Sequence, residues 1–281
     1  DTLGSKISAD VDFTIMDSER SSLLDNRSWA GNNDPELSYT DKSQTLNDMD
    51  YNIFTAKVDF TKALKGGKTL ESGLKGSWVE SDNNLDLSRA QNEGPFEQDP
   101  NSNRFIYNEN VLAAYVSLKG SFNEKLSYQG GLRGEYSDIV GNSVTLNQVN
   151  KQNYFNLFPS AFLSYTLGQE NDITLNYTRR ISRPSIWDLA PIYRVRDQFN
   201  LSIGNPYLQP EFTDSYEFGY MKGWERWLLN TTVYHRYSTN IETRITTINE
   251  DNVAIQRREN ADTRSSTGFE LINQIQVSER I

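Results

Sequence analysis

RRISRPSIWDLAPIYRVRDQFNLSIGNPYLQPE, residues Arg179 to Glu211, is a connection of about thirty residues between two alternating apolar–polar segments, Asp172–Arg179 and Thr213–Lys222. A loop of this length without a helix is uncommon in compact domains and is usually either functional or disordered. Its many apolar and aromatic side chains differ from the composition of a disordered linker: Trp187, Leu189, Ile192, Tyr193, Phe199, Leu201 and Tyr207. We therefore predict an ordered surface structure built on a β scaffold.

Alternation of apolar and polar residues is the main periodicity of the chain, and it predicts β-strands. In the segment Leu112–Phe122, for example, Ala114, Val116 and Leu118 alternate with Tyr115, Ser117 and Lys119. Similar sets occur in Asn52–Phe60, Leu126–Tyr136, Phe155–Tyr165, Phe212–Tyr220 and Phe269–Val277, whereas Leu228–Tyr237 is ambiguous between its two faces. The pattern predicts an all-β protein of about ten strands.

The predicted connections differ in length in a regular way. Short ones are expected at Lys65–Lys68, Asn123–Lys125, Gly168–Asn171 and Lys222–Arg226, and long ones at Ser18–Asp50, Ser81–Arg104, Val140–Gln152 and Ile181–Glu211. Because short and long connections alternate strictly, an up-and-down antiparallel sheet would place all short turns on one edge. That is the layout of an outer-membrane barrel, whereas a β-sandwich with Greek-key connections has no reason to sort its loops.

Composition excludes several classes of protein. The chain has 281 residues, a formal charge of −10, no cysteine and one histidine, so disulfides and thiol catalysis are excluded. An acidic balance argues against nucleic acid as a partner, because such proteins need a clustered basic face. No run of about 18 apolar residues predicts a membrane-spanning helix. The mean hydropathy of −0.68 still permits a barrel, whose strands need apolar residues only at alternate positions.

The two faces of the strands give a test of the barrel hypothesis. Polar residues such as Lys57 and Arg133 are expected to face a lumen, and Phe54, Val116 and Leu132 to face lipid. A charge on the lipid face would cost about 2–4 kcal/mol at mid-membrane. A structure with these apolar residues in a packed core and these charges outside would contradict the prediction.

Two stretches, YTRRISRPSIWDLAP (Tyr177–Pro191) and GNPYLQPEFTDSYEFGYMKGW (Gly204–Trp224), resemble the barrel region of TonB-dependent outer-membrane receptors of the Bacteroidetes-type outer-membrane β-barrel group. The resemblance implies part of an antiparallel up-and-down transmembrane β-barrel in the bacterial outer membrane, with short periplasmic turns and long extracellular loops. It further implies import of a large scarce nutrient, such as a glycan, peptide, siderophore complex or cobalamin-like compound.

The same resemblance implies the partners. These are outer-membrane lipid, the TonB energy-transducing complex acting through a plug segment, and a possible surface lipoprotein. Asp1 is not a start methionine, and QIQVSERI ends within a strand-like pattern without a terminal aromatic residue. We therefore expect residues 1–281 to be part of a single barrel domain, with the plug domain and the C-terminal strands outside the chain.

Candidate ligand-binding residues lie in the long connection. Five arginines lie in or beside it in an otherwise acidic chain: Arg179, Arg180, Arg183, Arg194 and Arg196. Arginine binds carboxylates and phosphates in a bidentate manner, so an anionic ligand or lipopolysaccharide phosphate is one interpretation and internal pairing with Asp188, Asp197 or Glu211 is the other. The aromatic residues either stack on a flat ligand or form a small core that holds the loop. The predicted contact residues are Arg183, Trp187, Tyr193, Arg194, Arg196 and Tyr207.

Enzyme and metal signatures are weak. The sequence has no glycine-rich phosphate loop, HExxH or GxSxG motif, and its single histidine, His235, lies in a strand-like run where an ordinary lumen or interface side chain is expected. The Asp82–Asp86 segment lacks the ligand spacing of a calcium loop. We expect no catalytic residue, metal or cofactor. The alternatives are a passive porin or adhesin-like barrel, a soluble all-β glycan-binding module, and an outer-membrane enzyme that uses His235.

Overall fold

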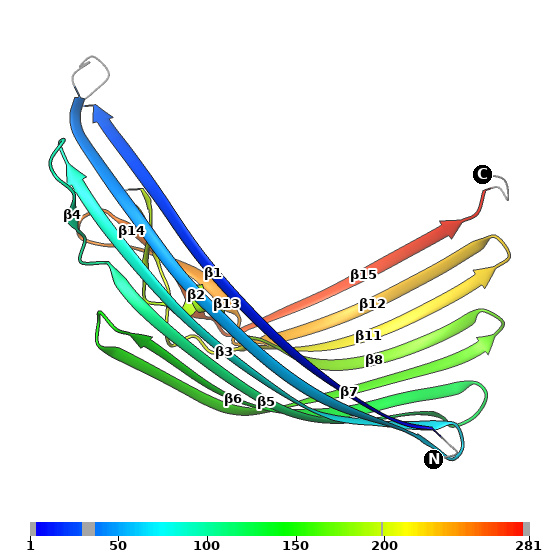
Figure 1. The fold of residues 1–281 in the computed structure, drawn as a ribbon. Coiled ribbons are helices and arrows are strands. Elements are labelled where there is room, and N and C mark those ends of the chain that lie inside the picture. Colours follow the sequence, from blue (N-terminus) through cyan, green and yellow to red (C-terminus); the bar gives the residue numbers. More distant parts are fainter. Residues whose placement is uncertain (1–3, 30–36, 198, 278–281) are drawn as a thin grey trace.

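The structure, a computed structural model, describes residues 4–29, 37–197 and 199–277, and it is dominated by one large antiparallel sheet (Figure 1). The strands pair in chain order: β1 (Ser5–Trp29), β2 (Leu37–Leu64), β3 (Lys68–Gln91), β5 (Asn103–Ser121), β6 (Leu126–Ser143), β7 (Gln148–Gly168), β8 (Asn171–Ser182), β11 (Glu211–Trp224), β12 (Trp227–Thr239) and β15 (Thr263–Ile275). The two-residue strand β4 (Glu97–Gln98) pairs with β3. The predicted all-β, up-and-down antiparallel fold is confirmed. In the described residues no pairing joins β1 to β15, and the sheet forms an open trough.

A second, smaller sheet is built from the two connections that interrupt the C-terminal half of the large sheet. Its order is β13 (Glu242–Ile248), β14 (Ala254–Asn260), β10 (Asn200–Ile203) and β9 (Tyr193–Asp197). β10 and β14 pair in parallel, although they come from different connections, and the other pairs are antiparallel. A single helical turn, α1 (Ile186–Leu189), precedes β9. Of the described residues, none belongs to a helix long and apolar enough to cross a membrane.

The two faces of the large sheet differ as the alternation predicts. On the convex face Phe54, Val116 and Leu132 are 40%, 48% and 44% exposed. On the concave face the side chains of Asp59 and Glu135 are only 17% and 9% exposed. The apolar side chains are therefore not in a packed core, and the charges are not on their side. This is the arrangement expected of a barrel wall whose outer face contacts lipid and whose inner face is polar.

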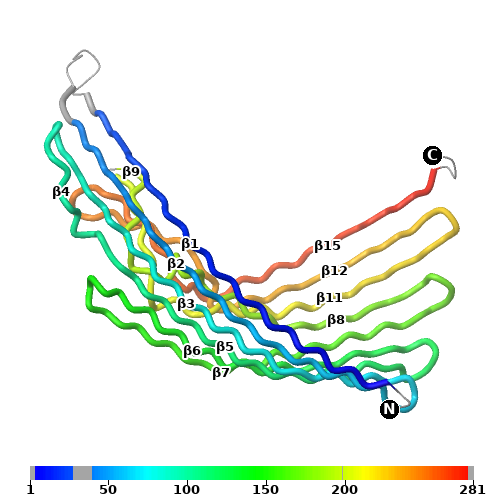
Figure 2. Tube along the Cα trace, in the orientation of Figure 1, coloured from blue at the N-terminus to red at the C-terminus, as the bar shows by residue number. Residues whose placement is uncertain are grey.

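The short connections lie where the sequence places them, along one edge of the sheet (Figure 2). The turn between β2 and β3 contains Gly66 and Gly67 at φ values of 76° and 69°, a left-handed conformation that glycine adopts without steric cost. In the turn between β5 and β6, the Asn123 side-chain oxygen accepts hydrogen bonds from the backbone N–H groups of Lys125 and Leu126. The turns between β7 and β8 and between β11 and β12 have two residues each.

Three of the four predicted long loops are wrong in detail, because most of their residues continue the strands. In Ser18–Asp50, β1 and β2 pair without interruption from Ser18↔Met49 to Arg27↔Thr40. In Ser81–Arg104, β3 continues to Gln91, and in Val140–Gln152 only residues 144–147 separate β6 from β7. Beyond the apolar band consecutive positions are often polar, as at Asp82, Asn83 and Asn84 of β3, so apolar–polar alternation is interrupted while the backbone ladder continues. The connection Ile181–Glu211 is the one predicted long loop that leaves the large sheet.

Candidate binding site on the concave face

The connection Ile181–Glu211 folds back onto the concave face through an apolar cluster. Four of its residues, Leu189, Ala190, Ile192 and Leu208, pack with four residues of the wall strands: Leu85, Phe105, Tyr107 and Ile139. All eight are buried, and Leu208 is only 1% exposed. Burial of each large aliphatic side chain contributes about 1.5–3 kcal/mol. The connection is therefore held against the wall by a core made of aliphatic residues and wall aromatics.

Local sequence fixes the path of this connection around α1. The Ser185 hydroxyl caps the helix by accepting a hydrogen bond from the Asp188 backbone N–H at 3.3 Å. The Asn205 backbone N–H donates to the Asp188 carbonyl oxygen at 2.6 Å, which brings the two ends of the excursion together. A Cβ atom on Gly204 would lie 2.1 Å from the Ala190 carbonyl oxygen, so this close approach requires glycine.

Side-chain amides of the wall bind carbonyl groups of the connection. Asn103 donates to the Pro191 carbonyl at 3.2 Å, and Asn150 donates to the Pro206 carbonyl at 3.0 Å. Gln152 donates to the carbonyls of Pro206 and Leu208 at 3.0 and 3.1 Å. Buried backbone carbonyls need such partners, and the wall supplies them where the irregular connection has no ladder of its own.

Arg183 anchors the start of the connection to the wall. Its guanidinium donates to Glu135 at 2.7 Å and to the Ser137 hydroxyl at 2.9 Å, and it lies 3.5 Å from Glu109. The Arg183 side chain is 22% exposed. These partners are internal, as one of the two sequence interpretations expects, but they lie on β5 and β6 rather than at Asp188, Asp197 or Glu211.

The other predicted contact residues fall in different surroundings. Tyr207 is 73% exposed, whereas Trp187 and Tyr193 are half-buried. Arg194 and Arg196 are exposed residues of β9, and they line the same pocket. The structure therefore brings together only these two of the six predicted residues in one cavity. Arg179 contacts Asp214 at 3.8 Å and lies over the Phe212 ring, 5.5 Å from its centroid.

The pocket that contains Arg194 and Arg196 is basic and has a volume of about 360 Å³. Residues of all four strands of the small sheet contribute to it, among them Ser202 of β10, Gln256 and Arg258 of β14, and Arg244 of β13. Arg244 and Arg258 were not singled out from the sequence. The alternation in ETRITTI and the basic pair in IQRREN were the available signals, but nothing in the sequence predicts that they join a sheet with residues fifty positions earlier.

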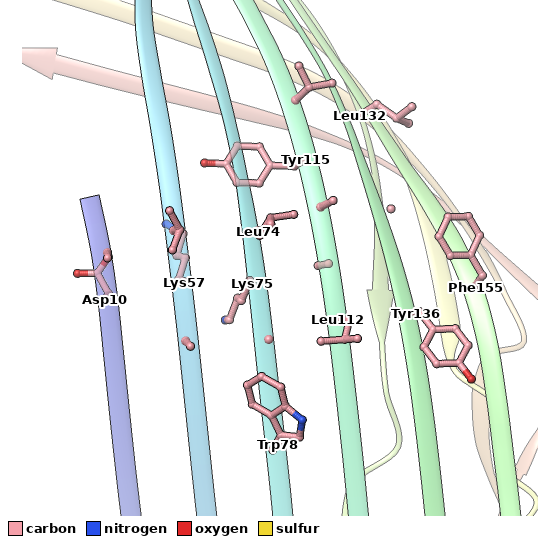
Figure 3. Close-up of a pocket in the computed structure, with 18 of the residues that line it drawn as sticks. Asp10, Lys57, Leu74, Lys75, Trp78, Leu112, Tyr115, Leu132, Tyr136 and Phe155 are labelled. Atoms are coloured by element: carbon pink, nitrogen blue, oxygen red, sulfur yellow. The ribbon is translucent and has the colours of Figure 1, made fainter. Parts of the chain in front are cut away.

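A larger, apolar groove of about 870 Å³ lies on the large sheet, and Figure 3 shows part of its lining. Leu74, Leu112 and Leu132 are 65%, 52% and 44% exposed there, on three different strands. Trp78, Tyr136 and Phe155 add large rings to the same surface. The Trp78 and Phe155 rings lie over Gly76 and Gly134, where a Cβ atom would come within 2.3 and 3.1 Å of them. An exposed apolar surface of this kind is expected where a barrel meets lipid.

The remaining candidates for chemistry lie apart from the basic pocket. His235 of β12 pairs with Tyr216 of β11, and its Nδ1 atom lies 2.9 Å from the Thr267 hydroxyl. Asp82 is on β3 and pairs with Arg104 at 2.5 Å, so it is a strand residue rather than part of a loop. Within the described ranges, no group of three or more His, Asp or Glu side chains is close enough to hold a metal ion.

The outer apolar face, the polar inner face and the sorted turns define a β-barrel wall of the bacterial outer membrane. The chain belongs to the outer membrane protein beta-barrel family, which it matches over residues 1–281. No curated protein sequence matches it.

Solved structures share the fold at low identity. The copper transporter OprC aligns with a TM-score of 0.62 and 13% identity, over 86% of this chain and 40% of its own. FpvAI in complex with pyocin S2 aligns with a TM-score of 0.63 and 12% identity, over 99% and 37%. The RagAB peptide importer aligns with a TM-score of 0.57 and 14% identity, over 96% and 32%. The fold is thus that of receptor and transporter barrels, and the chain spans 32–40% of the length of these three.

Proposed function

We propose that the chain is part of the barrel of a TonB-dependent receptor that captures and imports a large scarce nutrient. The observation that carries this proposal is the folded assembly on the concave face, where two connections combine into one sheet beside the inner wall. An ordered, pocket-bearing surface inside the mouth of a barrel favours a receptor over an open passive pore. The fold neighbours support a non-enzymatic transport role.

In this proposal residues 1–281 belong to a single barrel domain, and the plug domain and remaining strands are supplied by other parts of the full protein. This chain covers 40% of the length of OprC and 32% of that of the RagAB chain, which supports a larger barrel. The connections capture the nutrient, while polar groups of the inner wall hold the plug until the TonB complex displaces it. The nutrient classes remain glycan, peptide, siderophore complex and cobalamin-like compound, and a surface lipoprotein is a proposed partner. No covalent step is involved.

Uptake by cells tests the proposal. Bacteria that carry the full-length protein and bacteria that lack its gene are grown in a defined nutrient mixture, and depletion of each solute is followed by mass spectrometry. We expect at least one large solute to be depleted only by the first strain, and depletion to stop when a protonophore removes the energy for TonB. Receptor-dependent uptake that continues with the protonophore would indicate a passive porin. Release of the protein from membranes without detergent would indicate the soluble binding module.

The orientation of the barrel can be tested with single cysteines, because the chain has none of its own. Asp251, in the exposed turn between β13 and β14, and Lys65, in the short turn between β2 and β3, lie at the positions to compare. On intact cells a membrane-impermeant maleimide should label Asp251→Cys and leave Lys65→Cys unlabelled until the outer membrane is permeabilised. The reverse pattern would contradict the proposed orientation.

A further inference from the structure

We propose that the small sheet binds an anionic group of a soluble ligand, a carboxylate or a phosphate, between Arg194, Arg196 and Arg244. The role of this site in import rests on the proposed receptor function, whereas the binding itself does not. Four observations carry the proposal: the shared face of the arginines, their lack of ion pairs, the repulsion between them and the side of the barrel on which they lie.

Strand register places the polar residues of the pocket on one face of the small sheet. Arg194 of β9 is opposite Ser202 of β10, and Ser202 is opposite Gln256 of the parallel strand β14. One alternate position further along β14, Arg258 is opposite Arg244 of β13. Side chains at alternate positions of paired strands lie on the same face. Guanidinium, hydroxyl and amide donors from four strands therefore converge on one cavity of about 360 Å³.

The arginines of this face are unequally neutralised. Arg258 is bound by two carboxylates, Asp188 and Glu242, each at 2.9 Å. Within the described parts of the chain, no ion pair engages Arg194, Arg196 or Arg244. The chain carries 38 acidic residues against 28 basic ones, so carboxylates are not scarce. Three guanidinium groups without an ion pair therefore lie in one pocket, and Asp188, the carboxylate among its lining residues, is already bound by Arg258.

In the absence of a bound anion, the guanidinium groups of the pocket repel one another and destabilise the small sheet. Arg244 and Arg258 are directly opposite on neighbouring strands, a pairing that is destabilising for like charges. Although the Arg194 side chain is exposed overall, desolvation by the surrounding protein atoms lowers its pKa, and repulsion by Arg258 and Arg244 adds to this effect while Asp188 opposes it. A bound carboxylate or phosphate would relieve the repulsion and accept bidentate hydrogen bonds from the guanidinium groups. The hydroxyl of Ser202 and the amide of Gln256 supply further donors.

The position of the sheet favours a soluble ligand over a lipid headgroup. β9 and β10 belong to the connection that packs on the concave wall through Leu189 and Ile192, and Asn205 ties this connection to the Arg258 carbonyl at 3.0 Å. The apolar face that meets lipid is the opposite, convex one. A lipopolysaccharide phosphate would approach from outside the barrel, whereas a solute entering its mouth passes the basic pocket.

Binding to the purified full-length protein in detergent tests the site, with citrate and pyrophosphate as the probes. Calorimetric titration at low ionic strength should detect binding of at least one probe, and affinity should fall as salt is added. The triple variant R194Q/R196Q/R244Q should bind that probe at least about tenfold more weakly. In the matched control R264Q affinity should be unchanged, because Arg264 of β15 pairs with Glu211 and is not among the residues that line the pocket. An unchanged heat-modifiable mobility in gels would establish that the triple variant is folded.

Three results would overturn the proposal: no binding of either probe to the parent protein, equal binding to the parent and triple variant, or equal loss in R264Q. Binding of purified lipopolysaccharide through the same three arginines without binding of either soluble anion would overturn the assignment to a soluble ligand. Energised membranes are not needed for titration. Anion binding without protonophore-sensitive uptake would therefore contradict the receptor function and leave the site intact.

Discussion

Ser18–Asp50 and Ile181–Glu211 are two connections of similar length, and they adopt opposite structures. The first continues β1 and β2 as a long paired ribbon, with residues such as Glu19, Arg20 and Asp25 in ordinary ladder positions. The second leaves the large sheet, forms a helical turn and two short strands, and packs on the inner wall. The first projects away from the apolar band, and the second turns back into the concavity (Figure 1).

The difference follows from prolines and apolar residues. Ile181–Glu211 contains Pro184, Pro191, Pro206 and Pro210, which cannot donate to a ladder and so interrupt strand pairing. It also contains enough aliphatic side chains to build a buried cluster with the wall. In the described parts of Ser18–Asp50 the residues are mainly polar, so pairing with the neighbouring strand satisfies the backbone and no apolar surface draws the ribbon inward. Length alone does not distinguish the two outcomes.

The largest difference is expected from truncation of a leucine in each region. Leu208→Ala should destabilise the folded connection by about 2–5 kcal/mol, because Leu208 is 1% exposed in the cluster. Hydrogen exchange of the segment 186–210 in the full-length protein should accelerate more than about tenfold. Leu23→Ala, at a residue that is 66% exposed on β1, should leave exchange of its own ribbon unchanged. Equal effects would mean that the cluster does not hold the connection.

Removal of one ion pair from each region should show the same contrast in stability. Arg183→Met leaves Glu135, whose side chain is 9% exposed, with Arg133 as its remaining cation. Loss of one partner of a buried pair costs about 3–5 kcal/mol, and this partly solvated pair should lie at or below the lower end of that range.

The matched variant is Arg27→Met, which removes the exposed pair with Asp25 at 2.9 Å on β1. No measurable change in urea unfolding is expected for it, since solvent and salt screen exposed pairs. If Arg183→Met unfolds at the same urea concentration as the parent protein, Arg183 does not anchor the connection.

A smaller effect is expected from an added methyl group at the close approach within the connection. Gly204→Ala places Cβ against the Ala190 carbonyl, and the overpacking should cost about 1–3 kcal/mol. Gly168→Ala, where nothing lies within 4 Å of the new atom, is the control. Limited proteolysis of the folded protein should cleave within 186–210 faster in the first variant only. Identical cleavage would show that the backbone accommodates the methyl group.

The smallest effect is expected from shortening the ribbon. Deletion of residues 22–45, with Ser21 and Leu46 rejoined through an Asn-Gly turn, preserves the register at Arg20↔Asn47 and leaves the apolar band untouched. Membrane assembly, measured by heat-modifiable gel mobility, should match the parent. Failure to assemble would mean that the ribbon contributes to the barrel and is more than an extension of it.

The sequence predicts the strands whose two faces differ in polarity, because the alternation of apolar and polar residues then repeats along the chain. Alternation at Leu112–Phe122 or Phe155–Tyr165 reports a sheet with two unlike faces, and both strands are found in the wall. Where both faces are polar, as at Asp82 or Asn142, the signal vanishes although the strand continues. Intrinsic strand propensity cannot replace the missing alternation signal, because Asp and Asn are depleted in strands.

The candidate site is only half predictable for a related reason. Arg194 and Arg196 stand out by charge in an unusual loop, whereas Arg244 and Arg258 enter the pocket through strand pairing between distant connections. Arg183 resembles them in sequence, yet its partners Glu135 and Glu109 lie on wall strands far away in the chain. Side-chain type suggests binding, but only register assigns each arginine to the pocket or to the wall.

The parallel ladder from Asn200↔Ala254 to Ile203↔Arg257 unites two connections that are separated by the whole hairpin β11–β12. An insertion or deletion in either connection must preserve this ladder, or the sheet and its pocket are lost. The two segments therefore form one structural unit, which evolution must keep or change as a whole. Exchange of binding specificity with a related barrel would require transplanting residues 183–210 and 240–262 together, because either alone would bring half of a β-sheet without its partner.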